Sequence, residues 1–133
     1  MRYNIAFLHV EFPSGGAERA TMTLAAYLRG KGCRICVICR RFDADKVPDA
    51  ERDFYDDRRN VFAFGDMGRS ARTRFVARKC VEQNIDFLII QGHKNVYIRQ
   101  LSIFTPPHYK NYFLQPRAAF LGNRYKGGTQ EET

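Results

Sequence analysis

The stretch of sequence that decides the fold is IAFLHVEFPSGGAERATMTLAAYL, residues 5–28. It opens with an apolar run at residues 5–8, followed by Val10, which is the pattern of a strand buried on both faces. Pro13 then interrupts the strand, and the glycine pair that follows tolerates backbone angles closed to other residues. Ser14 is placed to accept a hydrogen bond from a helix amide. A strand that runs into a tight turn is therefore expected here.

Beyond the turn, the apolar spacing predicts a helix that begins at Ala17 and packs one side against a sheet. The expected inner stripe is Ala17, Ala20, Thr21, Leu24, Ala25 and Leu28. Glu18 lies in the first turn, where a carboxylate favours the positive helix end. A helix N-terminus after a glycine turn is also a place where anions bind. Gly15 and Gly16 therefore either admit a phosphate or hydroxyl to the backbone or form a tight turn with no ligand.

The rest of the chain alternates between strand and helix patterns. They predict strands at 34–40, 60–64, 87–90 and 109–113. They also predict helices at 71–83, capped by Ser70, and at 97–104. The charged residues 41–58 are expected to form a loop with a short helix near 48–55. In the 71–83 helix we expect Phe75, Val76, Cys80 and Val81 to face inward. This order predicts an α/β fold, a Rossmann-like three-layer sandwich with a mostly parallel sheet.

Length and composition set the class of protein. The 133 residues are 44% hydrophobic and 27% charged, which is typical of one soluble globular domain. We expect residues 1–121 to form that domain and residues 122–133 to be a polar, disordered tail. No segment approaches 18 uninterrupted apolar residues and the first ten residues lack a signal-peptide pattern, so we expect a cytoplasmic location.

The net charge of +8 favours anionic partners such as phosphorylated sugars, nucleic acid or an acidic membrane face. Part of it lies on the outer face of the 71–83 helix, which carries Arg69, Arg72, Arg74, Arg78 and Lys79. That face could bind phosphates or a membrane surface. A solvated basic helix face with no specific partner is the alternative, because long basic side chains are good exposed helix formers.

The cysteines are expected to be structural. Cys33, Cys36 and Cys39 have the spacing C-x2-C-x2-C, but they fall in an apolar strand, where Cys36 points opposite to the other two. They therefore read as small core residues, as does Cys80, and free thiols suit a reducing compartment. The adjacent pair Asp56–Asp57 lies in a charge run and is expected to be solvated, so we predict no metal site.

One motif resembles a known family. The string PSGGAERA at residues 13–20, between a strand and an amphipathic helix, resembles the Gly-Gly-Ala-Glu-Arg opening of the family-4 retaining glycosyltransferases. KGCR at residues 31–34, leading into an apolar strand, resembles that family's continuation. The resemblance is specific over residues 3–40 and looser to about residue 115. These enzymes have two facing Rossmann-like domains, the GT-B arrangement, with the acceptor on the N-terminal domain and the nucleotide sugar mainly on the C-terminal one.

The resemblance implies that this chain is the N-terminal, acceptor-side domain of an enzyme that moves a sugar from a nucleotide-sugar donor to an acceptor hydroxyl. It implies a substrate-binding role for Gly15, Gly16, Glu18 and Arg19, although an ion pair at the helix start explains the last two without a substrate. Strand ends supply further candidates, because ligands bind beyond the carboxyl ends of parallel strands. These are Lys94, Gln115 and Arg117 for anionic groups, and His93 as the catalytic candidate.

His93 could contact a sugar hydroxyl or phosphate, or act as a base near neutral pH. A structural or solvent-facing histidine is the alternative. His9, inside the first strand, is expected to be packed and hydrogen-bonded. The donor site of the resembled family includes a Glu-x7-Glu motif that is missing here, since Glu131 and Glu132 lie in the tail. We therefore expect the 133-residue chain to be inactive alone and to need a C-terminal domain or partner subunit for the donor.

The resemblance also implies the partners. The acceptor would be a sugar or a lipid-linked sugar, in cell-envelope polysaccharide biosynthesis. The basic face suits a phosphorylated or lipid-linked acceptor, with peripheral contact at the inner membrane face. No cofactor is expected. The cleft face of a separated domain would expose apolar surface, so the isolated chain could form a homodimer.

Two rival functions come from other classes. The first is a non-catalytic α/β binding module for an anionic or protein partner; a receiver-like version is weakened because the first strand ends in His-Val-Glu, without an aspartate pair. The second is a nucleic-acid binder, which lacks a recognisable motif. The aromatic residues of this chain fall on predicted core strands and not on an exposed stacking surface, so we expect no nucleic acid partner.

Overall fold

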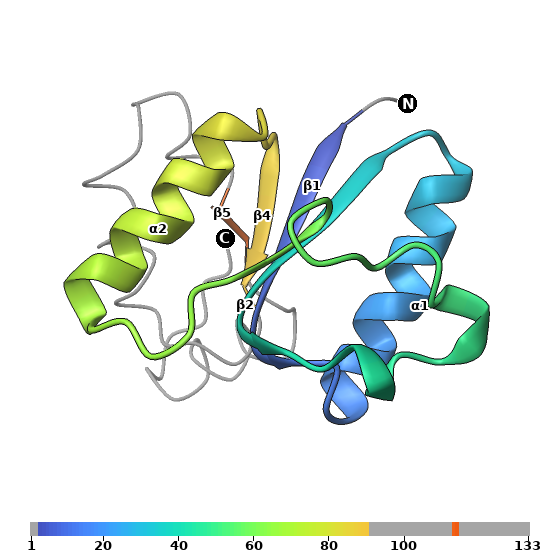
Figure 1. Ribbon diagram of the computed structural model, residues 1–133. Coiled ribbons are helices and arrows are strands. Elements are labelled where there is room, and N and C mark those ends of the chain that lie inside the picture. Colours follow the sequence, from blue (N-terminus) through green and yellow to red (C-terminus); the bar gives the residue numbers. More distant parts are fainter. Residues whose placement is uncertain (1–2, 91–112, 115–133) are drawn as a thin grey trace, which may run out of the picture.

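A computed structural model describes residues 3–90 and 113–114 and has the predicted Rossmann-like α/β fold (Figure 1). Its five strands are β1 (Asn4–Phe12), β2 (Arg34–Phe42), β3 (Val61–Ala63), β4 (Phe87–Ile90) and β5 (Phe113–Leu114). Its two α-helices are α1 (Gly16–Gly30) and α2 (Arg69–Glu82). All strand pairs are parallel, and α1 and α2 lie on opposite sides of the sheet (Figure 1). The predicted three-layer sandwich is confirmed.

The strand order β3-β2-β1-β4-β5 places β1 in the middle of the sheet. β1 pairs with β2 along most of its length, to Phe12 opposite Phe42, and with β4 up to Leu8 opposite Ile90. The chain steps away from β1 in one direction through β2 and β3, and then crosses to the other side to form β4. Open α/β sheets bind ligands at such a switch point, outside the carboxyl ends of the strands. The turn at residues 13–16 follows β1 at that edge.

The core has two halves, one on each face of the sheet. Ala6 and Leu8 of β1 belong to the cluster that includes the buried residues of α2, whereas Ile5 and Phe7 pack with Ala25 of α1. This alternation is the period of two of a strand. Both sets are buried because helices cover both faces, which is why the β1 sequence is almost continuously apolar.

The cysteines are core residues, as predicted. Cys36 belongs to the cluster on the α2 side, while Cys33 and Cys39 belong to clusters on the α1 side. All four are buried, and none of them is in a disulfide. Burial raises the pKa of Cys36 and of Cys39 to about 12, so both stay protonated and unreactive at neutral pH. Within residues 3–90 and 113–114, no group of three potential ligands could hold a metal ion.

The start and inner stripe of α1 differ from the prediction. Gly15 is the N-cap residue, so Ser14 does not cap the helix. Thr21 and Ala25 of the expected stripe are buried and Leu28 packs against the core, as predicted, but Leu24 and Ala20 are exposed and Met22 is buried instead. The stripe is rotated because polar side chains of α1 face the sheet, where they bond to His9 of β1.

α2 also differs in detail. It begins at Arg69 with Gly68 as its N-cap, so Ser70 lies within the first turn and does not cap the helix. Val76 and Cys80 are buried and Phe75 is partly buried, as expected, but Val81 is 43% exposed. Val81 lies about 100° around the helix from Cys80, beyond the stripe that meets the sheet.

Other boundaries shifted modestly. β2 extends to Phe42 and β3 is shorter than predicted, while the charged segment holds two short 3₁₀ turns, Ala44–Lys46 and Asp49–Glu51. This segment is not wholly exposed, because Val47 and Tyr55 are buried against β1 and β2 residues. The helix predicted at 97–104, the strand residues 109–112 and the tail at 122–133 lie outside the described residues.

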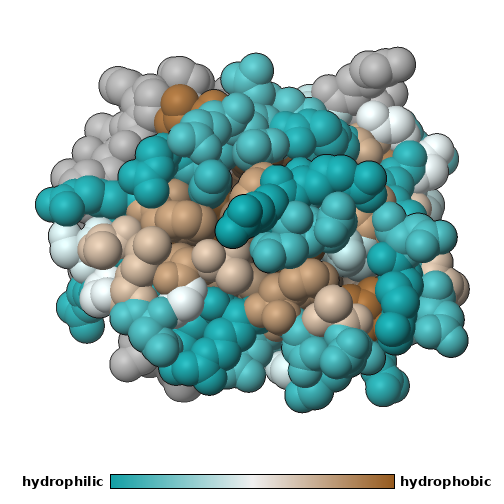
Figure 2. Space-filling model, viewed as in Figure 1, coloured by the Kyte–Doolittle hydropathy of each residue, from teal (hydrophilic) through white to brown (hydrophobic). Residues whose placement is uncertain are grey.

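The face of the molecule seen in Figure 2 is mostly polar. Figure 2 shows hydrophilic side chains over most of one face, with an apolar band across its middle. In the part of the chain that the structure describes, no helix has the length and apolar character needed to cross a bilayer.

The orientation of α2 can be tested with one substitution made at two sites. Val76→Ala should lower the free energy of unfolding by about 2 kcal/mol, because it removes fully buried methyl groups and leaves a cavity. Val81→Ala should change it by less than about 0.5 kcal/mol, since that side chain is 43% exposed. Urea unfolding of both variants measures the difference, and equal losses would contradict the observed helix orientation.

Candidate functional site

The turn after β1 is held in place by neighbouring backbone. Phe12 is the last strand residue, and Pro13, which has no amide hydrogen, cannot continue the ladder. The carbonyl of Phe12 accepts a hydrogen bond from the amide of Asp43 at 2.9 Å, which ties the ends of β1 and β2 together. Gly15 is extended (φ −154°, ψ −155°) and leads directly into α1 at Gly16. The helix N-terminus is thereby fixed beyond the carboxyl end of β1.

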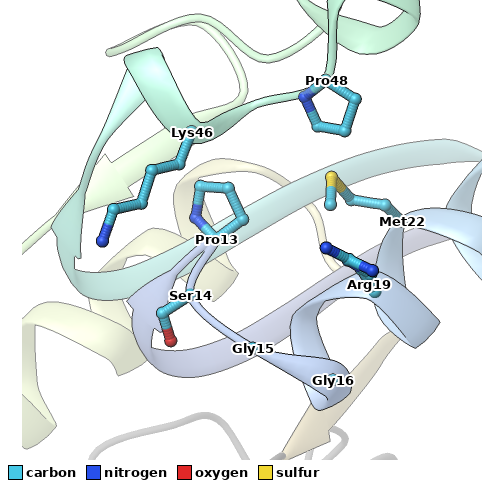
Figure 3. Close-up of a pocket in the computed structure, with 8 residues that line it drawn as sticks. All are labelled: Pro13, Ser14, Gly15, Gly16, Arg19, Met22, Lys46 and Pro48. Atoms are coloured by element: carbon cyan, nitrogen blue, oxygen red, sulfur yellow. The ribbon is translucent and has the colours of Figure 1, made fainter.

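A pocket of about 410 Å³ lies against this turn (Figure 3). It is lined by Pro13, Ser14, Gly15, Gly16, Arg19, Met22, Lys46 and Pro48. Arg19 comes from the first turn of α1 and Lys46 from the 3₁₀ turn after β2, and Pro13 lies between their side chains in Figure 3. Among the described residues neither cation has an ion pair, and no carboxylate or histidine belongs to the lining. The pocket is therefore electropositive.

A second hollow of about 340 Å³ adjoins the first and shares Pro13, Ser14 and Lys46 with it. It adds side chains of both charges from the carboxyl ends of β1 and β2 and from the residues that follow: Glu11, Arg41, Asp43 and Asp45. Carboxylates accept hydrogen bonds while guanidinium and ammonium groups donate them. This hollow therefore offers both kinds of partner next to a pocket that offers cations.

A buried histidine, His9, is linked to the turn through the carboxylate of Glu18. The amide of Gly15 donates to Oε1 of Glu18 at 2.8 Å, and Oε2 of the same carboxylate lies 3.3 Å from Nδ1 of His9. The other ring nitrogen, Nε2, is 2.8 Å from Oγ1 of Thr21. A carboxylate only accepts, so in the neutral ring Nδ1 carries the proton and Nε2 accepts from the Thr21 hydroxyl. The prediction that His9 is packed and hydrogen-bonded is confirmed.

The Glu18 carboxylate has two effects on the pocket. As the third residue of the helix it satisfies the N-cap amide, which is one half of a capping box. It also places a negative charge near the helix N-terminus and occupies the amide of Gly15. An anion in the pocket would therefore depend on the next helix amides and on Arg19 and Lys46.

The glycine at position 16 is not required by the fold. Its φ is not positive, and a Cβ built on it would meet no atom within 4 Å. In a helix interior alanine is favoured over glycine by about 1 kcal/mol, and at the first residue of α1 we expect a smaller gain of the same sign. Because Gly16 lines the pocket, the missing side chain leaves the first helix amides open to a ligand.

The predicted site residues divide into three groups. Gly15, Gly16 and Arg19 line the pocket, whereas Glu18 holds the turn. Glu18 contacts His9, and no ion pair joins it to Arg19 in the described chain, so the alternative of an ion pair at the helix start is wrong. The remaining candidates lie outside the described residues: His93, Lys94, Gln115 and Arg117.

Sequence reasoning missed Lys46 and Met22. Lys46 lies in a charged segment without periodicity, and only the fold brings it to the turn at residues 13–16. The one feature of the sequence that could have indicated its position is the apolar residue Val47, which follows it and is buried in the core. Met22 is buried on the inner side of α1, although the expected stripe did not include it.

The fold and the site together define a Rossmann-like α/β domain with a cationic pocket at the carboxyl edge of its sheet. No family model matches this chain, and no curated protein matches its sequence. What the protein does is therefore inferred from the pocket and from the motif at residues 13–20.

The buried histidine should make stability depend on pH. Burial lowers the pKa of His9 below its ordinary value of 6.5, although the neighbouring Glu18 opposes the shift. As pH falls through about 6.5, the unfolded chain takes up a proton that folded His9 does not, so the free energy of unfolding should fall by up to about 1.4 kcal/mol per pH unit. Denaturant unfolding between pH 7.5 and pH 5.5 (about one unit either side of 6.5) measures this slope. His9→Asn should flatten it, and an unchanged slope in that variant would contradict the assignment.

Proposed function

We propose that this chain is the acceptor-side domain of a retaining glycosyltransferase that moves a sugar from a nucleotide-sugar donor to an acceptor hydroxyl. The observation that carries the proposal is the position of the cationic pocket. It lies beyond the carboxyl end of β1, at the switch point of the sheet, and is built on Gly15, Gly16 and Arg19 of the motif that resembles this family.

In this proposal the described residues bind and orient, and a C-terminal domain or partner subunit brings the nucleotide sugar. Arg19 and Lys46 would balance the negative charge of a phosphate group. Gly16 would let that group approach the helix amides. The adjoining hollow, with carboxylates and Arg41, suits the hydroxyl groups of a sugar, which both donate and accept hydrogen bonds.

A non-catalytic binding module is the second candidate, and one observation favours it. The lining of the cationic pocket contains no carboxylate and no histidine, so the residues described there can hold an anion but cannot take a proton from an acceptor hydroxyl. Under this alternative the same pocket binds an anionic ligand and no reaction follows.

Sugar transfer is tested on the native polypeptide, purified from its source cells with any associated subunit. Given a panel of nucleotide sugars and a lipid extract as acceptor source, we expect a product whose anomeric configuration, read by NMR, matches that of the donor. Arg19→Ala should lower kcat/KM about ten- to a hundredfold, the worth of one hydrogen bond to a charged group.

Arg78→Ala is the matched control, because Arg78 is an exposed arginine on α2 and does not line the pocket. It should leave transfer unchanged. If the native polypeptide binds phosphates but transfers no sugar from any donor, the binding module is the better description.

The open position at Gly16 gives a test that separates binding from folding. Gly16→Ala should keep or slightly raise the melting temperature, since the helix gains a better former. It should also weaken binding of inorganic pyrophosphate about fivefold, through the loss of about one hydrogen bond to a helix amide. Isothermal titration calorimetry measures the affinity.

Gly30→Ala is the control at the other end of α1, where an added Cβ also meets nothing within 4 Å. It should leave pyrophosphate affinity unchanged. Equal affinity of the two variants and the unmodified chain would place the ligand away from the helix N-terminus.

A further inference from the structure

We propose that His9 is a positioning residue for the cationic pocket. By holding Glu18, it fixes the turn at Gly15 and Gly16 in the conformation that leaves the helix amides open. The inference depends on the proposed function in one respect, namely that the pocket is the ligand site. His9 itself does not line the pocket and acts only through its neighbours.

Both oxygens of the Glu18 carboxylate have a partner. One oxygen accepts from the Gly15 amide at 2.8 Å and the other lies 3.3 Å from Nδ1 of His9. The Glu18 side chain is 13% exposed, so it cannot replace a lost partner with water unless it moves. Without the His9 donor, the carboxylate gains by turning toward solvent, and the Gly15 amide then loses its acceptor.

The orientation of the His9 ring is fixed by its neighbours. Its Nε2 lies 2.8 Å from Oγ1 of Thr21, and its ring centroid is 5.6 Å from that of Phe12. His9 is 1% exposed, so these contacts define its position. The two ring nitrogens therefore connect the middle sheet strand to two successive turns of α1.

Two residues of the pocket lining directly follow the helix residues that contact His9. Glu18 immediately precedes Arg19, and Thr21 immediately precedes Met22, and both following residues line the pocket. The rotation of α1 about its axis is thereby set by His9, and with it the direction of the Arg19 guanidinium. A core residue needed only for packing would be apolar, because burying an imidazole without partners is costly.

Two substitutions at His9 separate positioning from packing. Asparagine places an amide nitrogen near the position of Nδ1 and can still donate to Glu18, whereas glutamine reaches the position of Nε2 and serves Thr21 instead. The first measurement is hydrogen exchange of the Gly15 amide, compared with the amide of Leu8 in the core of β1. The second is the affinity for inorganic pyrophosphate at pH 7.5, a pH about one unit above the ordinary pKa of histidine.

We expect His9→Gln to speed exchange of the Gly15 amide about tenfold and to weaken pyrophosphate binding by about the same factor, with Leu8 still protected. His9→Asn should stay within about twofold of the unmodified chain in both, because the donor to Glu18 is kept. In a Glu18→Ala background His9→Gln should have no further effect, since its action passes through that carboxylate.

If both His9 variants lose binding and Gly15 protection together, in step with exchange at Leu8, His9 is only a packing residue and the inference is wrong. If the unmodified chain binds no pyrophosphate, the proposed function fails, while the exchange of Gly15 still decides the positioning role. A third measurement needs no variant: nitrogen NMR of the unmodified chain should show the proton on Nδ1. A neutral ring with its proton on Nε2 would overturn the inference even if no variant folds.

Discussion

The parallel pairing of β1 with a strand on each side is the constraint on which the rest of the structure depends. β2 and β4 both take their register from β1, and each face of β1 is closed by a different helix. From Ile5 to His9 the side chains of β1 are buried on whichever face they point to, so a polar side chain is tolerated there only where a partner meets it. His9 is such a residue, and its partners come from the helix that follows the strand.

The chemistry of the site follows from that arrangement. β1 stays paired with β2 as far as Phe12, so the turn after it lies at the carboxyl edge of the sheet, at the point where the strand order reverses. The positive charge there has two sources, the start of α1 and the segment after β2, while Glu18 offsets part of it. In the proposed function, an anion would therefore be held by the side chains of Arg19 and Lys46 more than by the turn itself. This differs from glycine loops whose amides enclose a phosphate.

The sequence predicted most where one physical effect dominated. The strand at residues 5–8, the alternation of the cysteines and the alternating order of elements all followed from burial on both faces. Prediction from the sequence failed where two physical effects competed. Ser14 and Ser70 are good capping residues, yet Gly15 and Gly68 take the N-cap positions. Lys46 and the partners of His9 depend on which segments meet in space, and periodicity carries no information on that.

The origin of Lys46 has an evolutionary consequence. The segment that carries it is anchored to the core by Val47, and hydrogen bonds from Arg52 to the carbonyls of Asp45 and Val47 hold the segment together internally. The sheet does not pass through it, so substitutions at its exposed positions leave strand pairing intact. Selection can therefore change the charge and shape of the pocket through surface residues between β2 and β3, while β1 and α1 stay constant.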